Sequence, residues 1–195
     1  MEHPGHGGAP LADVRTVADL ARLALEQVAA GRFSFVGLSL GGAIGMQLAL
    51  ESPHRLDKLV LCSTATHFGE TYRERAAIVR ARGLEAVVAT VLERWFTPSF
   101  ADVRRYREMF LSTDAEGYAR CCEALAEWDV RGCLGRVRVP TLCIAADDDP
   151  VTPPAALEAI AAEIPGARVT VIPDGRHLTN VERATEFNAA LFEHL

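Results

Sequence analysis

The sequence lacks long hydrophobic runs, an excess of basic charge and the cysteine spacing of a metal site. Its longest apolar stretches, such as residues 59–62, are far shorter than the roughly 20 residues that a membrane-spanning helix needs. The net charge is -6 at pH 7, and no basic stripe dominates, which argues against a nucleic-acid-binding protein. We therefore expect no membrane span and no nucleic-acid partner.

The cysteines do not indicate a disulfide framework. There are five of them, an odd number, and their spacing is typical of reduced core residues rather than of metal ligands. They are Cys62, Cys121, Cys122, Cys133 and Cys143. Residues 1–5 show no secretory pattern. We therefore expect a cytoplasmic protein that uses no metal and no cofactor.

Apolar patterning predicts alternating strands and helices in a chain of single-domain size. The 195 residues are 49% hydrophobic and 24% charged, which is ordinary for a globular domain with a sizeable core. Short apolar runs predict buried strands, and they occupy residues 33–36, 58–62, 140–145 and 168–172. Because helical segments separate these runs, we expect an α/β fold with a parallel sheet.

Capping residues mark several helix boundaries. Thr16, followed three residues later by Asp19, has the arrangement of a capping box at the start of the first helix. Thr152 is expected to cap a helix over residues 155–163, because prolines that suit a first helical turn follow it. Asn180 is expected to cap the last helix.

Residues 66–135 differ in character from the rest of the chain. They hold most of the aromatic residues, and they predict short helices without a run that resembles a buried parallel strand. An insertion of this size is more than a simple crossover between parallel strands. We therefore expect a helical cap over the carboxyl edge of the sheet, with residues 1–65 and 136–195 forming one core domain.

Residues 37–41 form a G-x-S-x-G pattern between the first predicted strand and the helix that follows it. A nucleophilic serine in this context stands on a turn too tight for bulky neighbours, which Gly37 and Gly41 would relieve. The helix would point its N-terminal amides and its dipole at Ser39, favouring negative charge there. The backbone N–H of Leu40 is the candidate oxyanion donor.

Two further loops at the same predicted edge carry groups that a nucleophilic serine requires. The carboxyl ends of parallel strands direct their loops into one crevice. His177 follows the last predicted strand, and histidine is suited to accept a proton near neutral pH. A carboxylate behind the ring would hold it in one tautomer, and spacing alone leaves Asp148 and Asp149 as alternatives.

Six segments together resemble the α/β-hydrolase superfamily, and within it the 3-oxoadipate enol-lactonases of aromatic-acid degradation. They are residues 37–42, 62–66, 94–96, 113–122, 149–154 and 177–182. The first and the last two are typical of the superfamily, in which the order serine, aspartate, histidine recurs. The cap segments, residues 94–96 and 113–122, narrow the resemblance to the lactonase group. It selects Asp149 as the acid and implies that water hydrolyses an enol-lactone through an acyl-Ser39 intermediate.

A lactone that carries a carboxylate would need a cationic partner in the cap. Arg94 and Arg120 are the candidates for this substrate-binding role, and Trp95 is expected to line the pocket. The only partner that we expect is the small-molecule substrate. The oligomeric state stays open.

The sequence departs from that family at its beginning. Family members begin with several strands, one of whose loops supplies a second oxyanion N–H, whereas residues 2–7 here resemble the segment that closes the last of those strands. We therefore expect that Met1 is an internal or misassigned start and that the active protein carries an N-terminal extension. Without it, the strand at residues 33–36 would be an exposed apolar edge. An in-frame stop codon immediately upstream of Met1 would contradict this hypothesis.

Other functions remain as alternatives. Within the superfamily they are a carboxylesterase, a C–C bond hydrolase and a cofactor-free haloperoxidase, whereas Ser39 disfavours dehalogenases and epoxide hydrolases, which use an aspartate nucleophile. A hypothesis of another class is a non-catalytic remnant or binding protein. Activity on a chromogenic ester, compared with that of a Ser39→Ala variant, would distinguish an enzyme from such a remnant.

Overall fold

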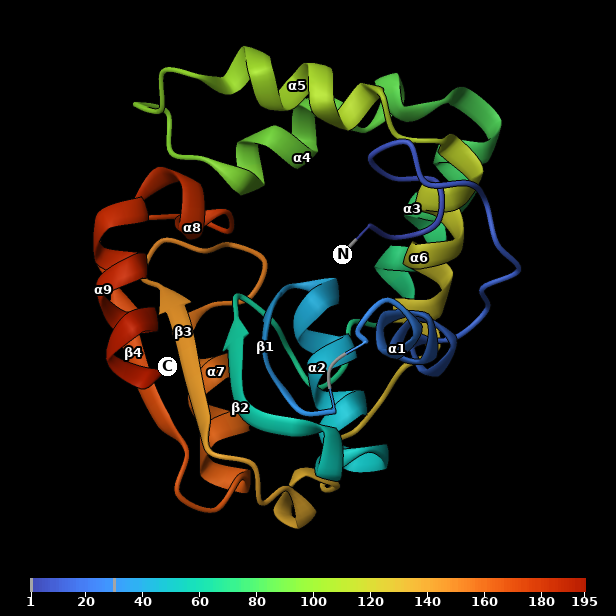
Figure 1. Ribbon diagram of the computed structural model, residues 1–195. Helices are drawn as coiled ribbons and strands as arrows, with labels where there is room; N and C mark the ends of the chain where they lie inside the picture. Colours follow the sequence, from blue (N-terminus) through green and yellow to red (C-terminus); the bar gives the residue numbers. More distant parts are fainter. Residues whose placement is uncertain (1, 30) are drawn as a thin grey trace.

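The sheet of the described chain consists of parallel strands that lie side by side in chain order (Figure 1). The computed structural model describes residues 2–29 and 31–195, so Met1 and the hypothesis about it lie outside the described residues. The strands are β1 (Phe33–Leu38), β2 (Leu56–Cys62), β3 (Thr141–Ala146) and β4 (Arg168–Ile172). The predicted α/β fold with a parallel sheet is confirmed.

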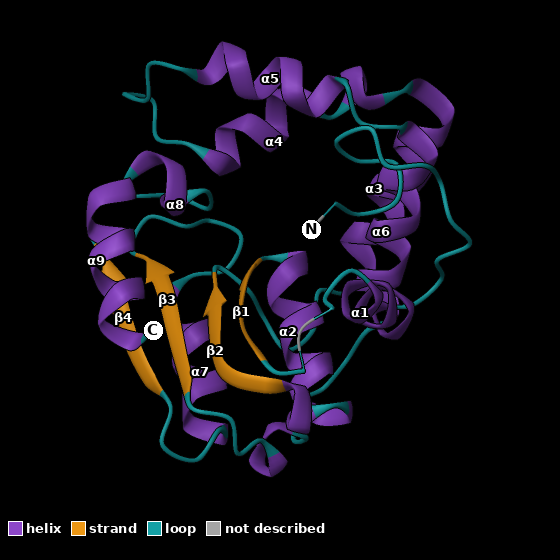
Figure 2. Ribbon diagram, viewed as in Figure 1, coloured by secondary structure: helices purple, strands orange, loops and turns teal. Residues whose placement is uncertain are grey.

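Helices connect the strands and pack on both faces of the sheet (Figure 2). The α-helices of the described residues are α1 (Val17–Glu26), α2 (Leu40–Glu51), α3 (Glu70–Arg82), α4 (Val88–Trp95), α5 (Val103–Leu111), α6 (Ala115–Glu127), α7 (Pro154–Glu163), α8 (Thr179–Glu182) and α9 (Ala184–His194), of which α2, α7 and α9 pack on the sheet. The first of them begins with the predicted capping box of Thr16 and Asp19. In the part of the chain that the structure describes, no helix has the length and apolar character needed to cross a membrane.

The central strands alternate between two apolar clusters, so both faces of the sheet are buried. Leu59 and Leu61 of β2 belong to the cluster that contains the inner faces of α2 and α7. Val60 and Ile144 point the other way and pack with Phe187 of α9. Burial on both faces explains the nearly continuous apolar runs that predict these strands.

β1 is the edge strand. It pairs with β2, and no other strand of the described residues bonds its outer side. Phe35 is buried in the core, whereas Val36, which points to the opposite face, is 41% exposed. β1 therefore presents an open apolar edge, as expected for this strand when no neighbour covers it.

Two predicted helix caps are wrong. The N-cap of α7 is Pro153 rather than Thr152, and the Thr152 hydroxyl donates to Asp149 rather than accepting an N–H of the helix. Asn180 lies inside the short helix α8 and does not cap it. The expected last helix is two helices, since the backbone of Arg183 (φ -124°, ψ 48°) leaves the helical conformation between α8 and α9.

Helices α3 to α6 follow β2 and precede β3, and in Figure 1 α4 and α5 lie beyond the arrowheads of the strands. Helices α3 and α6 pack against each other, and α4 packs against α5. The only extended pairing in residues 66–135 is an isolated bridge between His67 and Asp129. This segment is therefore helical, as the sequence predicts.

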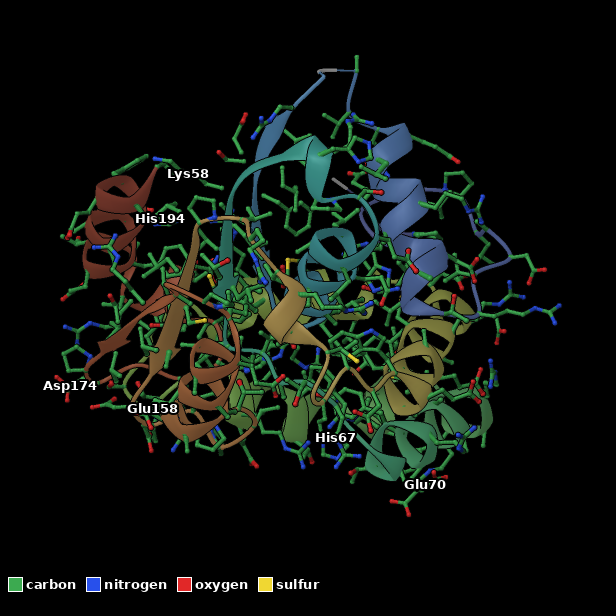
Figure 3. All side chains as sticks on the ribbon, turned by 90° about the horizontal axis from the view of Figure 1, so that it is seen from below. Lys58, His67, Glu70, Glu158, Asp174 and His194 are labelled. Atoms are coloured by element: carbon green, nitrogen blue, oxygen red, sulfur yellow. The ribbon has the colours of Figure 1, made fainter. Side chains whose placement is uncertain are left out.

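The chain end is tied to β2 by Lys58. Its Nζ donates to the backbone oxygens of His194 (2.7 Å) and Leu195 (2.8 Å). Figure 3 shows Lys58 and His194 close together at one end of the molecule. A cation at a helix C-terminus complements the helix dipole, so this contact helps to hold α9 against β3 and β4.

Candidate active site

Ser39 lies on the sharp turn between β1 and α2. Its backbone has φ 55° and ψ -112°, a conformation that is uncommon for a residue with a side chain. Two hydrogen bonds hold the turn in place. The Ser39 N–H donates to the carbonyl of Cys62 (2.9 Å), and the Thr64 hydroxyl donates to the carbonyl of Ser39 (2.9 Å).

Two glycines make room for this turn. A Cβ on Gly37 would lie 2.1 Å from the carbonyl oxygen of Gly41, and one on Gly42 would lie 2.5 Å from the Cβ of Thr64. Any side chain at either position would therefore displace the backbone or its neighbour. The expected steric need for glycine at position 41 is wrong, because a Cβ there would meet no atom within 4 Å.

His177 and Asp149 form a buried, hydrogen-bonded pair. The Nδ1 of His177 lies 2.8 Å from Oδ2 of Asp149, and the two residues are 4% and 3% exposed. Oδ2 also accepts from the Thr152 hydroxyl (2.8 Å), while Oδ1 accepts from the backbone N–H groups of Val151 (2.8 Å) and Thr152 (3.1 Å). Asp149 can thus hold the ring with Nδ1 protonated and Nε2 available as an acceptor.

The pKa of Asp149 lies below its ordinary value. Burial favours the neutral carboxyl and by itself would raise the pKa, but the hydrogen bond and charge of His177 and the donors of Thr152 outweigh it. The stabilisation that this carboxylate contributes is therefore present above the ordinary pKa of aspartic acid and is lost as the pH falls through the lowered pKa. At neutral pH, Asp149 is ionised.

The structure distinguishes between the two aspartates that spacing alone leaves open. The Oδ2 of Asp148 pairs with Nε of Arg176 at 2.8 Å and is largely exposed. Asp149 is the one that contacts His177. The geometry therefore agrees with the choice that the family resemblance implies.

Ser39 and His177 line the same cavity, which has a volume of about 430 Å³. Leu40 also lines it and is the first residue of α2. The N–H groups of a first helical turn have no acceptor within their own helix, so the Leu40 amide is available to an oxygen bound beside Ser39. A serine, a histidine held in one tautomer and an amide donor at one cavity are the groups that acyl transfer requires.

Of the predicted substrate-binding residues, Arg94 and Trp95 line this cavity and Arg120 does not. The wall formed by α6 consists of residues 118, 121, 122 and 125, which share one helix face. Position 120 falls outside that face. The expected role of Arg120 at the substrate is therefore at odds with its position, because the orientation of α6 turns the side chain away from the cavity.

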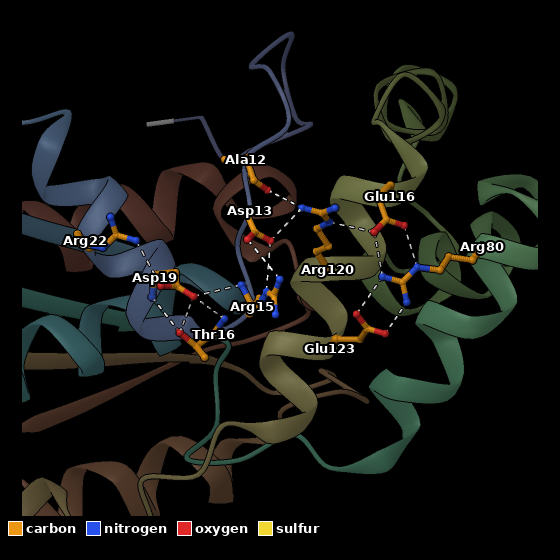
Figure 4. A network of polar contacts seen from close by, with 10 residues as sticks. All are labelled: Ala12, Asp13, Arg15, Thr16, Asp19, Arg22, Arg80, Glu116, Arg120 and Glu123. Carbon is orange, nitrogen blue, oxygen red and sulfur yellow. Dashed lines mark hydrogen bonds and ion pairs between the residues drawn. The ribbon is translucent and has the colours of Figure 1, made fainter.

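Arg120 instead belongs to a polar network on the outer side of α6 (Figure 4). Its Nη1 donates to the carbonyl of Ala12 (2.9 Å), and its Nε pairs with Glu116 (2.9 Å). Arg80 of α3 joins the network through Glu116 and Glu123. These contacts connect the N-terminal segment, α3 and α6, so Arg120 supports the wall of the cavity from behind.

Sequence reasoning missed Arg75, Tyr72 and Tyr118, which also line the cavity. The Cζ of Arg75 lies 4.7 Å from the ring centroid of Tyr72, a cation–π contact. Burial alone would lower the pKa of Arg75, but the nearby Tyr118 and Tyr72 outweigh it and raise the pKa, so the guanidinium is charged. The only sequence signal was the i, i+3 spacing of Tyr72 and Arg75, which does not reveal which way the helix faces.

The N-terminal loop adds His3 and His6 to the cavity wall. The loop docks on the start of α6, where the N–H of Asp114 donates to the carbonyl of Gly5 (2.8 Å). A Cβ on Gly117 would lie 2.9 Å from the Cα of Gly5, so the two segments are in close contact. Burial, and then the neighbouring His6, lower the pKa of His3 to about 4, which leaves this ring neutral at pH 7.

The cysteines are free thiols, as predicted. Cys121 and Cys122 line the cavity, but burial raises their pKa to about 12 and about 11, so neither is a reactive thiolate at neutral pH. Within residues 2–29 and 31–195, no three histidine, cysteine, aspartate or glutamate side chains gather as candidate metal ligands.

Known enzymes are similar to this chain over most of its length. The 3-oxoadipate enol-lactonase 2 of Acinetobacter baylyi is 37% identical over 174 residues, which are 86% of this chain and 65% of that protein. The chain therefore spans just under two thirds of the length of this relative. The crystal structure of the enol-lactonase from Burkholderia xenovorans LB400 matches with a TM-score of 0.94 and 32% identity, covering 98% of this chain and 78% of that one.

A second solved structure and a family model also match this chain, and both are of hydrolases. The crystal structure of a hydrolase from Pseudomonas aeruginosa PA01 matches with a TM-score of 0.92 and 36% identity, covering 98% of this chain and 77% of that one. The model of the alpha/beta hydrolase fold matches residues 1–184. Because that match takes in nearly the whole chain, including the turn at Ser39 and the loop of His177, the chain belongs to the α/β-hydrolase family.

Proposed function

We propose that the protein is a serine hydrolase that cleaves a lactone or ester bond. The observation that carries the proposal is the buried pair of His177 and Asp149, which lies at the same cavity as a serine on a strained turn. The similarity to two enol-lactonases supports acyl-bond chemistry rather than another reaction of the family.

In the proposed mechanism, Ser39 attacks the acyl carbon of the substrate while Nε2 of His177 accepts the hydroxyl proton. Asp149 stabilises the imidazolium through Nδ1, and the N–H of Leu40 donates to the oxygen that becomes negative. His177 then gives the proton to the leaving oxygen as the carbon–oxygen bond breaks, which leaves an acyl-Ser39 ester. Water activated by His177 hydrolyses this ester, releasing the carboxylate and restoring the serine hydroxyl.

A serine-directed fluorophosphonate tests the proposed nucleophile. We expect one covalent adduct, located by peptide mass spectrometry at Ser39, because Nε2 of His177 would accept its proton. An excess of a competing lactone should slow the labelling. Absence of an adduct on the folded protein, or an adduct at a different serine, would contradict the proposal.

We propose that residues 66–135 act as a cap over a core formed by residues 1–65 and 136–195. The origin of the residues that line the cavity supports this arrangement. Ser39 and His177 come from loops of the sheet, whereas α3 and α4 contribute Arg75 and Trp95. The reacting groups would thus belong to the core, and the groups that select the substrate would belong to the cap.

The substrate that we propose is an enol-lactone with a carboxylate, such as 3-oxoadipate enol-lactone. Arg75 and Arg94 both line the cavity, and no ion pair among the described residues includes either of them. A partly buried guanidinium without a counter-charge is costly, and a substrate carboxylate would offset that cost through charge-assisted hydrogen bonds. The indole of Trp95 and the side chain of Val91 provide apolar surface for the ring of the lactone.

The Arg75→Gln variant tests the substrate class. We expect KM for a carboxylate-bearing lactone to rise about 10- to 100-fold, because a hydrogen bond to a charged group contributes about 1.5–3 kcal/mol. KM for a neutral ester should change much less. Arg104→Gln is the matched control, since Arg104 is an exposed arginine of α5 that does not line the cavity. Equal losses on the charged and the neutral substrate would contradict the proposed contact.

A further inference from the structure

The side chain of Arg176, the residue before His177, contacts two other parts of the molecule. Its Nε pairs with Oδ2 of Asp148 (2.8 Å) in the loop after β3. Its Nη1 donates to the carbonyl of Glu93 (2.6 Å) and, over a longer distance, to that of Phe96 (3.4 Å), both at the C-terminal end of α4. We call this set of contacts the Arg176 bridge; it joins the loops of Asp148 and His177 to α4.

Further hydrogen bonds connect the same segments on either side of the bridge. The N–H of Leu178 donates to the carbonyl of Trp95 (3.1 Å). The carboxylate of Glu182 accepts from the backbone N–H of the arginine (3.0 Å) and from that of Thr97 (2.8 Å). The histidine loop is therefore fastened on both sides to residues 93–97.

The chemistry of the guanidinium suits this position. Its planar fork presents several donors at fixed angles, so one side chain can serve a carboxylate and helix-end carbonyls together. A cation at the C-terminal end of α4 also complements the dipole of that helix. The side chain of Arg176 is 24% exposed, and it does not line the cavity, so it is not placed to touch a substrate.

We propose that Arg176 is a positioning residue that keeps His177 in register with the end of α4 that binds the substrate. This inference rests on the proposed function, because it requires that His177 accepts a proton and that the cap binds the substrate. Arg94 and Trp95 lie in the last turn of α4, next to the carbonyls that the Arg176 bridge holds. A shift of α4 without the bridge would therefore displace a bound substrate relative to His177.

The Arg176→Met variant keeps an apolar side chain of similar length and removes the guanidinium group. We expect kcat/KM for a carboxylate-bearing lactone to fall about 10- to 100-fold. A displacement of the substrate by about 1 Å relative to a catalytic group can lower the rate by up to about 100-fold. Labelling of Ser39 by a small fluorophosphonate should slow much less, because the cap does not hold this reagent. Arg183→Met is the matched control, since the ion pairs of Arg183 are with Asp174 and Glu186, neither of which belongs to α4.

The outcome separates positioning from stability. An arginine that only stabilises the fold would lower the melting temperature and leave both rates unchanged below it, or lower both rates equally, and either result would overturn the inference. Arg176→Lys keeps the charge but cannot serve all acceptors at once, so it should show a smaller loss with the same preference for the lactone. If the wild-type protein is not labelled at Ser39, the proposed function fails as well; if it is labelled and Arg176→Met behaves like it, the Arg176 bridge alone is refuted.

Discussion

Replacing Ser39 with alanine is expected to lower kcat for lactone or ester hydrolysis by about 10⁶-fold. The reason is that the hydroxyl forms the bond to the acyl carbon, and no other side chain on this turn can replace it. The residual rate would come from binding and from the Leu40 amide, which the substitution leaves in place. Initial rates on a chromogenic ester, together with a thermal melt to show that the fold is kept, provide the measurement.

Ser34→Ala is the control for this experiment. Ser34 lies on β1, the strand that leads to Ser39, and is exposed, so the Ser34→Ala variant should hydrolyse the ester as the wild-type protein does. If the Ser39→Ala variant retains the wild-type rate, the observed hydrolysis does not depend on Ser39. The hypothesis of a non-catalytic remnant or binding protein would then be favoured.

The Asp149→Asn substitution is expected to lower kcat by about 10⁴-fold with little change in the position of the side chain. An asparagine can turn its NH₂ toward Nδ1 of His177, which then accepts and places its proton on Nε2, the wrong tautomer for a base. The donors of Val151 and Thr152 favour this orientation, because they require the amide oxygen on the side that faces them. Steady-state rates measured above the pH at which Asp149 loses its charge provide the test.

Asp147→Asn is the matched control, since Asp147 is an exposed neighbour in the same loop. It should keep the wild-type rate. A loss of less than about tenfold in Asp149→Asn would mean that His177 does not depend on this carboxylate for its tautomer, and the proposed mechanism would need another orienting group.

The features that could be predicted from the sequence are those that depend on local rules. The strands β2 and β3 are recognisable because burial on both faces requires an unbroken apolar run. The turn at Ser39 is recognisable because a Cβ at Gly37 would collide with the backbone. Thr16 caps α1 as predicted because the capping box needs only residues three positions apart.

The features that could not be predicted depend on how helices turn within the folded molecule. Arg75 and Arg120 are both arginines on helices between β2 and β3, and their sequences do not show which of them faces the cavity. That orientation follows from the packing of α3 against α6. The role of Thr152 was missed for a similar reason, because its hydroxyl serves a carboxylate rather than the helix that follows it.

The outer side of β1, which no strand of the described residues covers, has a consequence wherever it stays open. A strand edge with free N–H and C=O groups is a template for any other strand, including that of another copy. β1 leads directly into Ser39, and Val36 belongs to the cavity wall as well as to the exposed surface. Wherever this edge stays uncovered, a strand that pairs along it would also contact the cavity wall at Val36, so association between copies and access to the cavity would respond together to protein concentration.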